Sequence, residues 1–176
     1  MAEGSSNAAL VERVRSGSPE AIAELYALHG PRLYRIARRL MPTAEDAEDI
    51  LQDVFVGLPE AIREYEHRDT LEGWLRTLTV RASLMAARTQ QRRREVSFSD
   101  VAMTAPAEAP ATVDRITLEK TLGRLPDTMR QVFVLKVVEG YSHNEIGEFL
   151  GITSDASRMQ LHRAREVLER RLRSSA

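Results

Sequence analysis

Apolar residues recur at helical spacing in two long stretches of the chain, separated by a segment without this period. In the first stretch the pattern predicts three helices, over residues 19–40, 43–58 and 70–94. Ser18 before Pro19 is typical of a capped helix start, and Met41-Pro42 is expected to end the first helix. The third helix is expected to bury one apolar stripe, made of Leu71, Trp74, Leu75, Leu78, Ala82 and Met85.

Between the two stretches, residues 96–112 lose the helical period and collect Ala, Pro, Ser and Thr. This composition is typical of a flexible tether between domains. We therefore expect an all-α protein with two small helical domains, over residues 1–95 and 116–176, joined by a flexible linker over 96–115.

The second domain is expected to be a helix-turn-helix domain. Ser142 and Glu145 form a capping box, Gly151 is expected to end that helix, and Thr153 or Ser154 to cap the next one. The final helix carries an apolar stripe along one side: Leu161, Ala164, Leu168 and Leu172. Two more helices are predicted ahead of this motif, over residues 113–122 and 127–139.

The composition argues against several kinds of site. The chain has no cysteine, and its four histidines show no ligand-like spacing, so we expect neither a metal site nor a cofactor. No run of about 18 apolar residues is present, so we expect no membrane segment. The N-terminal MAEGSSNAAL lacks the basic start and apolar run of a signal peptide, which predicts a cytoplasmic protein.

The net charge is only −1, but the charges are sorted into blocks of opposite sign. Residues 43–53 hold five acidic residues and no base, whereas residues 81–94 hold five arginines and no acid. Residues 154–173 carry six arginines against three acidic residues. Arginine suits bidentate contacts to phosphate or guanine, although a GC-rich genome would produce the same preference for arginine.

The last helix is a candidate for binding in the DNA major groove. In a helix-turn-helix, the N-terminal turns of the second helix contact base edges and phosphates. Here the candidate residues are Ser154, Arg158, Met159, His162 and Arg163. The alternative, a solvated amphipathic helix, is disfavoured by the capped helix and glycine turn before it. Asp155 would repel phosphates, and we expect it to cap the helix rather than to accept from a cytosine amine.

The basic end of helix 70–94 has the composition of a surface that holds a nucleic-acid backbone. The alternative is a solvated helix end, stabilised because positive charge complements the helix dipole. Trp74 could stack on a base, but its place on the apolar stripe favours a role in the core.

The acidic helix begins with a capping-box-like pair, Thr43 and Asp46, and carries Asp49 and Asp53 on one face. Catalytic carboxylates would need a positioned base or nucleophile, a phosphate loop or a metal set, and the sequence offers none of these. We therefore do not expect an enzyme. The acidic face favours a basic protein partner, with a merely solvated face as the alternative.

Two segments resemble a known family. Residues 44–56, AEDAEDILQDVFV, followed by Trp74-Leu75 and a basic helix, resemble the second region of the small extracytoplasmic-function (ECF) sigma factors of bacterial RNA polymerase, in the sigma-70 family. The segment LPDTMRQVFVLKVVEGYSHNEIGEFLGI, then LHRAREVLERRL, resembles their fourth region. The resemblance covers about residues 18–94 and 116–173.

The resemblance implies a transcription initiation factor that binds core RNA polymerase and directs it to specific promoters, with an anti-sigma factor as a further partner. Asp49, Gln52 and Asp53 would dock on the clamp coiled coil of the largest polymerase subunit. The last helix would recognise the minus-35 element as duplex DNA. The melted minus-10 strand would be bound by the loop 65–69 and the basic helix, through Tyr65, His67, Arg81, Arg88, Arg92 and Arg93.

Two other hypotheses stay open. The chain could be a helix-turn-helix regulator that binds operator DNA as a dimer without polymerase, although the acidic helix argues against it. It could also be a sigma-like decoy that only sequesters an anti-sigma factor, although Arg92-Arg93-Arg94 and Arg163 argue against that. In the minus-10 helix, residues frequent in the family are replaced by Arg81 and Met85. In the last helix they are replaced by the segment 153–157 and by Gln160, so the resemblance predicts no particular minus-35 sequence.

Overall fold

The chain divides into two compact helical units, Met1–Arg92 and Arg93–Ala176. The structure is a computed structural model that describes residues 2–66, 70–96 and 121–173. Within these ranges every regular element is a helix, as the apolar periodicity predicts. Most of the predicted linker and of the predicted helix 113–122 lies outside the described residues.

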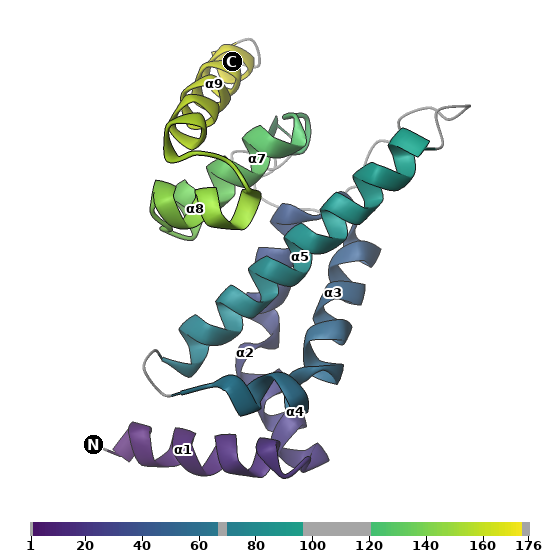
Figure 1. The fold of residues 1–176 in the computed structure, drawn as a ribbon, viewed down its shortest axis with the longest axis vertical. Coiled ribbons are helices and arrows are strands. Elements are labelled where there is room, and N and C mark those ends of the chain that lie inside the picture. Colours follow the sequence, from purple (N-terminus) through teal and green to yellow (C-terminus); the bar gives the residue numbers. More distant parts are fainter. Residues whose placement is uncertain (1, 67–69, 97–120, 174–176) are drawn as a thin grey trace. The chain divides into compact units, whose positions relative to one another are not determined.

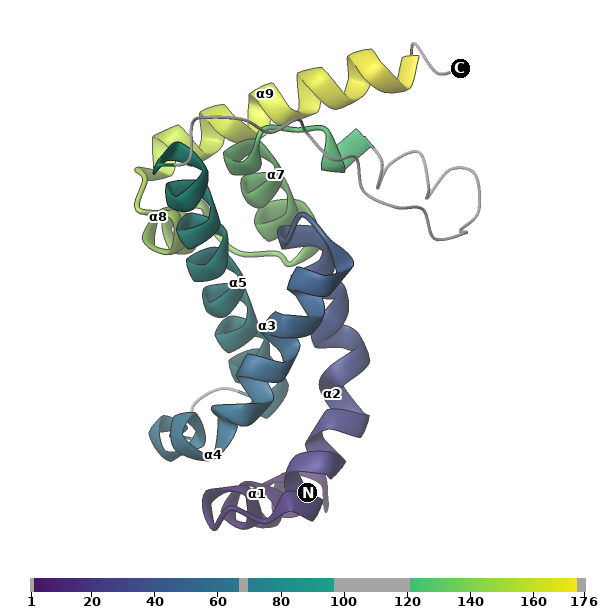
Figure 2. The same cartoon turned by 90° about the vertical axis from the view of Figure 1, so that its right-hand side faces the viewer.

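The first unit is built on α2 (Pro19–Leu40), α3 (Ala44–Val56) and α5 (Leu71–Val96). Figures 1 and 2 show α3 returning alongside α2, and α5 running beside both. Arg32 of α2 pairs with Glu72 near the start of α5, and Gln90 near its end bonds to Asp46 of α3. Three further elements complete the unit, namely α1 (Ala2–Arg15), α4 (Leu58–Ala61) and the 3₁₀ turn η1 (Ile62–Glu64).

The predicted starts of α2 and α3 are confirmed by side-chain caps. Ser18 Oγ accepts from the Ala21 N–H at 3.3 Å, and Thr43 Oγ1 accepts from the Asp46 N–H at 3.0 Å. The pattern did not predict α1, which buries Leu10, Val11 and Val14.

The predicted inner face of α5 is confirmed only in part. Leu71 and Leu75 are buried, whereas Trp74, Leu78 and Ala82 are partly exposed and the prediction for Met85 is wrong. Met85 is 66% exposed, whereas its neighbour Leu84 is 3% exposed. Because a helix turns about 100° per residue, the buried face passes through Val80 and Leu84 and leaves Met85 outside. Thr79 and Ser83 can join this face because their hydroxyls donate to carbonyl oxygens four residues earlier, at 2.9 Å each.

The second unit contains α7 (Asp127–Phe133), α8 (His143–Leu150) and α9 (Ser154–Arg173), with α7 and α8 both packed on α9. The predicted helix 127–139 is interrupted, since α7 continues as a π-helical turn, η2 (Val134–Val138). The predicted stripe of α9 is confirmed for Leu161, Ala164 and Leu168, which are buried. The Leu172 side chain lies outside the described residues.

Candidate nucleic-acid interface

The turn between α8 and α9 is built by a capping box and two glycines. Ser142 Oγ accepts from the Glu145 N–H at 3.2 Å, and Glu145 Oε2 accepts from the Ser142 N–H at 2.7 Å. Gly151 ends α8 with φ +68°, in the left-handed conformation predicted for it. A Cβ at Gly147 would lie 2.6 Å from the Ile152 carbonyl oxygen, so only glycine permits this close approach of turn to helix.

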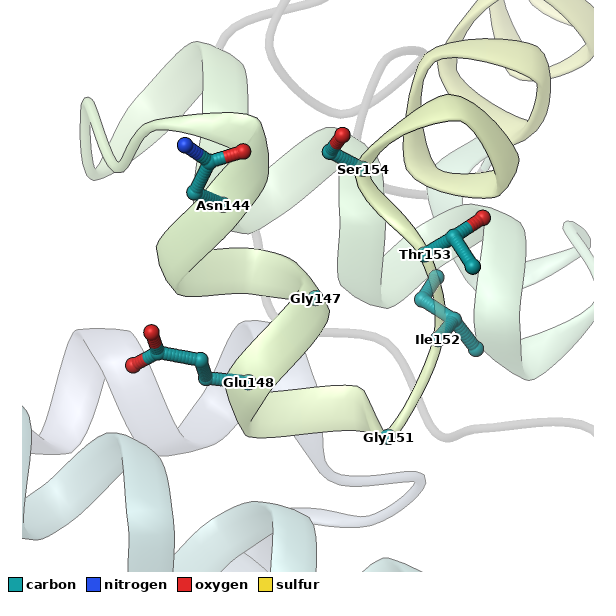
Figure 3. Close-up of a pocket in the computed structure, with 7 residues that line it drawn as sticks. All are labelled: Asn144, Gly147, Glu148, Gly151, Ile152, Thr153 and Ser154. Carbon is teal, nitrogen blue, oxygen red and sulfur yellow. The ribbon is translucent and has the colours of Figure 1, made fainter.

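A hollow open to solvent lies at this turn (Figure 3). Its lining residues are Asn144, Gly147, Glu148, Gly151, Ile152, Thr153 and Ser154. Glu148 is the one ionisable side chain among them, so the hollow offers no positive charge to an anion. No group of three His, Cys, Asp or Glu side chains suited to a metal occurs in the described part of the chain. We assign no ligand to this hollow.

The cap of α9 is Thr153, whose Oγ1 accepts from the Ala156 N–H at 3.1 Å. The expectation that Asp155 caps this helix is therefore wrong. Its carboxylate instead pairs with Arg158, at 2.6 Å between Oδ1 and Nη1. The sequence named Thr153 as one possible cap, but spacing alone does not rank a threonine against an aspartate two positions later.

The predicted major-groove residues gather on the outer side of α9. Arg158, Met159, His162 and Arg163 are exposed, and Ser154 is partly exposed. Ser157 and Leu161 are buried on the opposite side. His162 lies 3.5 Å from Glu166 one turn later, a contact that becomes an ion pair when the imidazole is protonated. The structure thus separates a buried face of α9 from an exposed face that carries all the predicted contact residues.

His143 links α8 to α9. Its Nδ1 lies 2.9 Å from the Ser157 hydroxyl, and this hydrogen bond joins the start of one helix to the inner face of the next. Burial lowers the pKa of His143, and the positive charges of Lys136, Arg158 and Arg165 lower it further. His143 was not predicted, because the first residue of a helix gives no sign of a bond fourteen residues away.

The start of the predicted minus-10 loop is held in place from two sides. The Tyr65 ring is 6% exposed and packs against Trp74, with ring centroids 5.4 Å apart. Arg15 of α1 donates to the carbonyl oxygens of Ile62 at 3.3 Å and Tyr65 at 2.6 Å. Trp74 is partly buried and packs on Tyr65, so its predicted core role is confirmed only in part. Arg15 was not predicted, because no local pattern marks its contact with a carbonyl fifty residues away. His67, the other candidate in this loop, lies outside the described residues.

The basic candidates of α5 lie on its surface. Arg81, Arg88, Arg92 and Arg93 are all exposed. They span three turns of the second half of the helix, where their positive charge also complements the helix dipole. The structure does not separate these two effects, and the assignment of these arginines to DNA stays a prediction.

The acidic candidates share one face of α3. Asp49, Gln52 and Asp53 are exposed, while Ile50, Leu51, Val54 and Phe55 fill the core behind them. Val56 continues the exposed face at its end and is 81% exposed. The sequence analysis missed Val56, because a valine in an apolar run gives no sign that it faces solvent.

The acidic and basic helices are joined by one polar cluster. Asp46 Oδ2 accepts from the Thr43 hydroxyl at 2.6 Å, and Asp46 Oδ1 accepts from Gln90 Nε2 at 2.6 Å. The same aspartate therefore supports the start of α3 and holds the basic end of α5 beside it.

Comparison with known proteins decides the family. The model for sigma-70 region 2 matches residues 25–93, and the model for sigma-70 region 4 matches residues 115–168. The RNA polymerase sigma factor CarQ of Myxococcus xanthus is 32% identical over 161 residues, which cover 90% of this chain and 92% of CarQ. The chain belongs to the sigma-70 family of RNA polymerase sigma factors. The ECF RNA polymerase sigma factor SigE of Mycolicibacterium smegmatis is 33% identical over 153 residues, which cover 82% of this chain and 59% of SigE.

Solved structures agree with this assignment. The sigma factor RpoE of Bartonella quintana, solved in complex with the anti-sigma factor NepR, matches with a TM-score of 0.67 at 25% identity. The match covers 86% of this chain and 96% of RpoE. The prediction of an ECF-type sigma factor is confirmed, and with it the function of a transcription initiation factor that directs RNA polymerase to promoters. In the part of the chain that the structure describes, no helix has the length and apolar character needed to cross a bilayer.

Proposed function

We propose that this sigma factor docks on core RNA polymerase through the exposed face of α3. The observation that carries the proposal is that Asp49, Gln52 and Asp53 lie together on the solvent side of a helix whose other side is buried. Two carboxylates and an amide suit a basic partner surface. Val56 adds an apolar contact at the end of the same face. The partner that we assign is the clamp coiled coil of the largest polymerase subunit.

For the minus-10 element, the proposed surface is the loop 65–69 together with the outer side of α5. Single-stranded DNA is held by a cationic track combined with contacts to its bases. The exposed arginines supply the track, and the loop that begins at Tyr65 and contains His67 would contact bases, with the buried Tyr65 ring anchoring the loop rather than touching a base. Support comes from Arg15 and Trp74, which order the start of this loop.

For the minus-35 element, the proposed surface is the outer side of α9. Its candidate residues are Ser154, Arg158, Met159, His162 and Arg163. The buried stripe and the glycine turn orient this side away from the core of the unit, which is the arrangement that lets a helix-turn-helix place its second helix in the major groove.

The proposal extends to location, partners and domain limits. The protein would act in the cytoplasm on polymerase as a factor without catalytic activity of its own. RpoE was solved bound to an anti-sigma factor, which supports a partner of the same kind here. We place the region 2-like domain at 1–95, the linker at 96–115 and the region 4-like domain at 116–176.

Transcription with purified components tests the proposed function. Core polymerase is incubated with a library of randomised promoters, with and without the purified chain, and the transcripts are sequenced. We expect the chain to create start sites downstream of two shared elements that core polymerase alone does not use. Identical start sites with and without the chain would contradict the proposal, and tight binding to duplex DNA without polymerase would favour an operator-binding regulator.

A further inference from the structure

The first turn of α9 carries an exposed ion pair between Asp155 and Arg158, neither of which caps the helix. Arg158 Nη1 donates to Asp155 Oδ1 at 2.6 Å, and the two side chains are 58% and 89% exposed. The Ser154 hydroxyl lies 3.4 Å from the same nitrogen. Since Thr153 caps the helix, the Asp155 carboxylate is not needed for that role. The pair is held at the surface with two polar contacts on one guanidinium nitrogen.

The pair lies on the face of α9 that points away from the core. Asp155, Arg158 and Met159 are spaced i, i+3, i+4, so they share one side of the helix. Ser157 and Leu161 take the buried side. This step rests on the proposed function, under which the exposed face of the first turns enters the major groove at the minus-35 element.

The Asp155 carboxylate is repelled by DNA phosphates but can accept a hydrogen bond from a base. Phosphate oxygens only accept hydrogen bonds and carry negative charge, so Asp155 weakens binding to every DNA sequence alike. A cytosine presents an N4 amine in the major groove, from which a carboxylate can accept. A guanine presents O6 and N7, which match two parallel donors of an arginine. Asp155 therefore favours sequences that place a cytosine amine within its reach, because it weakens binding to all other sequences.

We infer that Asp155 and Arg158 act together to select guanine and cytosine in the minus-35 element. Arg158 donates from Nε and Nη2 to a guanine, while its Nη1 stays on Asp155. The second carboxylate oxygen of Asp155 accepts from the amine of a cytosine in the neighbouring base pair. The ion pair thus fixes the guanidinium plane before DNA arrives, which lowers the entropy that Arg158 loses on binding.

Selection from a randomised minus-35 duplex by the reconstituted holoenzyme tests the inference. The variants are Asp155→Ala, Asp155→Asn and Arg158→Ala, with Arg163→Ala as the matched control on the same helix. We expect Arg158→Ala to lower the preference for guanine at one position about tenfold. We expect Asp155→Ala to lose the neighbouring preference for cytosine and to bind unselected DNA more tightly. Asp155→Asn should shift that preference to adenine, because an amide pairs with adenine N6 and N7.

The Arg163→Ala control and the remaining outcomes distinguish failure of the base-selection inference from failure of the proposed minus-35 surface. Arg163→Ala should weaken binding to all sequences equally, as loss of a phosphate contact does. Unchanged base preferences in Asp155→Ala and Arg158→Ala would overturn the inference and leave the sigma-factor function intact. If the wild-type holoenzyme selects no sequence at all, the proposed minus-35 surface fails together with the inference. All three positions are exposed, so we expect the four variants to fold, and an unchanged circular dichroism spectrum checks this for each variant.

Discussion

Arg15 is a single side chain that orders the start of a functional loop. Its guanidinium binds the carbonyl oxygens of Ile62 and Tyr65, at the end of η1. The Ile62 carbonyl oxygen also accepts from the Tyr65 N–H at 3.2 Å, and a cation beside the carbonyl groups of a helix end adds charge-assisted hydrogen bonds to them. α1 thereby fixes the chain immediately before the residues proposed to contact the minus-10 strand.

We predict that Arg15→Ala lowers the free energy of unfolding of the first unit by about 1–3 kcal/mol, because two hydrogen bonds from a charged donor are lost. Trp74 is the one tryptophan of the chain and packs on Tyr65, so its fluorescence during urea denaturation reports on this region. Promoter opening should also slow, while affinity for core polymerase stays unchanged.

The matched control for Arg15 is Arg13→Ala on the same helix. Within the described residues, the Arg13 side chain pairs with Glu24 at 3.0 Å, and both are about half exposed; such exposed pairs contribute less than about 1 kcal/mol. Equal denaturation curves for the two variants would show that the carbonyl contacts of Arg15 do not order the loop.

The burial and the partners of individual side chains could be predicted from the sequence only in part. Met85 was expected inside and lies outside, because periodicity defines a stripe only to within one residue. Asp155 was expected to cap α9 and instead pairs with Arg158. Contacts between residues far apart in sequence, such as Arg15 with Tyr65, depend on the packing of α1 and leave no local pattern.

At the scale of elements, start and stop signals were the most reliable guide. The caps at Ser18, Thr43 and Ser142 and the glycine stop at Gly151 occur where the sequence predicts them, because each satisfies backbone groups locally. The π-helical turn after α7 was not predicted. It depends on how Val134 and Leu135 pack, and both are fully buried.

His143 lies partly buried where α8 meets α9, and this position makes the packing of the two helices sensitive to pH. The pKa of His143 is lowered in the folded state, mainly by burial, from its ordinary value of 6.5. Below 6.5 the unfolded chain therefore binds a proton that the folded chain resists binding. His143 therefore does not reduce the free energy of unfolding above 6.5. As the pH falls from 6.5 through the lowered folded pKa, the free energy of unfolding decreases.

We predict that acidification below 6.5 destabilises α8 and α9 more in the wild type than in His143→Gln, which keeps a hydrogen-bonding group but does not titrate. Urea titrations followed by amide NMR signals of the two helices, above and below this pH, measure the difference. The same pH dependence in both proteins would exclude His143 as its source.

At the scale of the whole molecule, a net charge of −1 conceals surfaces of opposite sign. The sequence could predict this sorting because each block is continuous along one helix. It could not predict that Gln90 bonds to Asp46 across forty-four residues and so joins the basic end of α5 to the start of the acidic helix. The family assignment agrees with a division of labour in which one surface binds protein and two bind DNA.

The most direct test of this account is the affinity of the chain for core RNA polymerase when the face of α3 is reversed in charge. We predict that Asp49→Arg with Asp53→Arg weakens binding about a hundredfold or more, because like charges would meet at the interface. Glu24→Arg with Glu60→Arg, an equal change in charge on exposed positions elsewhere in the first unit, should leave the affinity nearly unchanged. Wild-type affinity in the α3 variant would contradict the account.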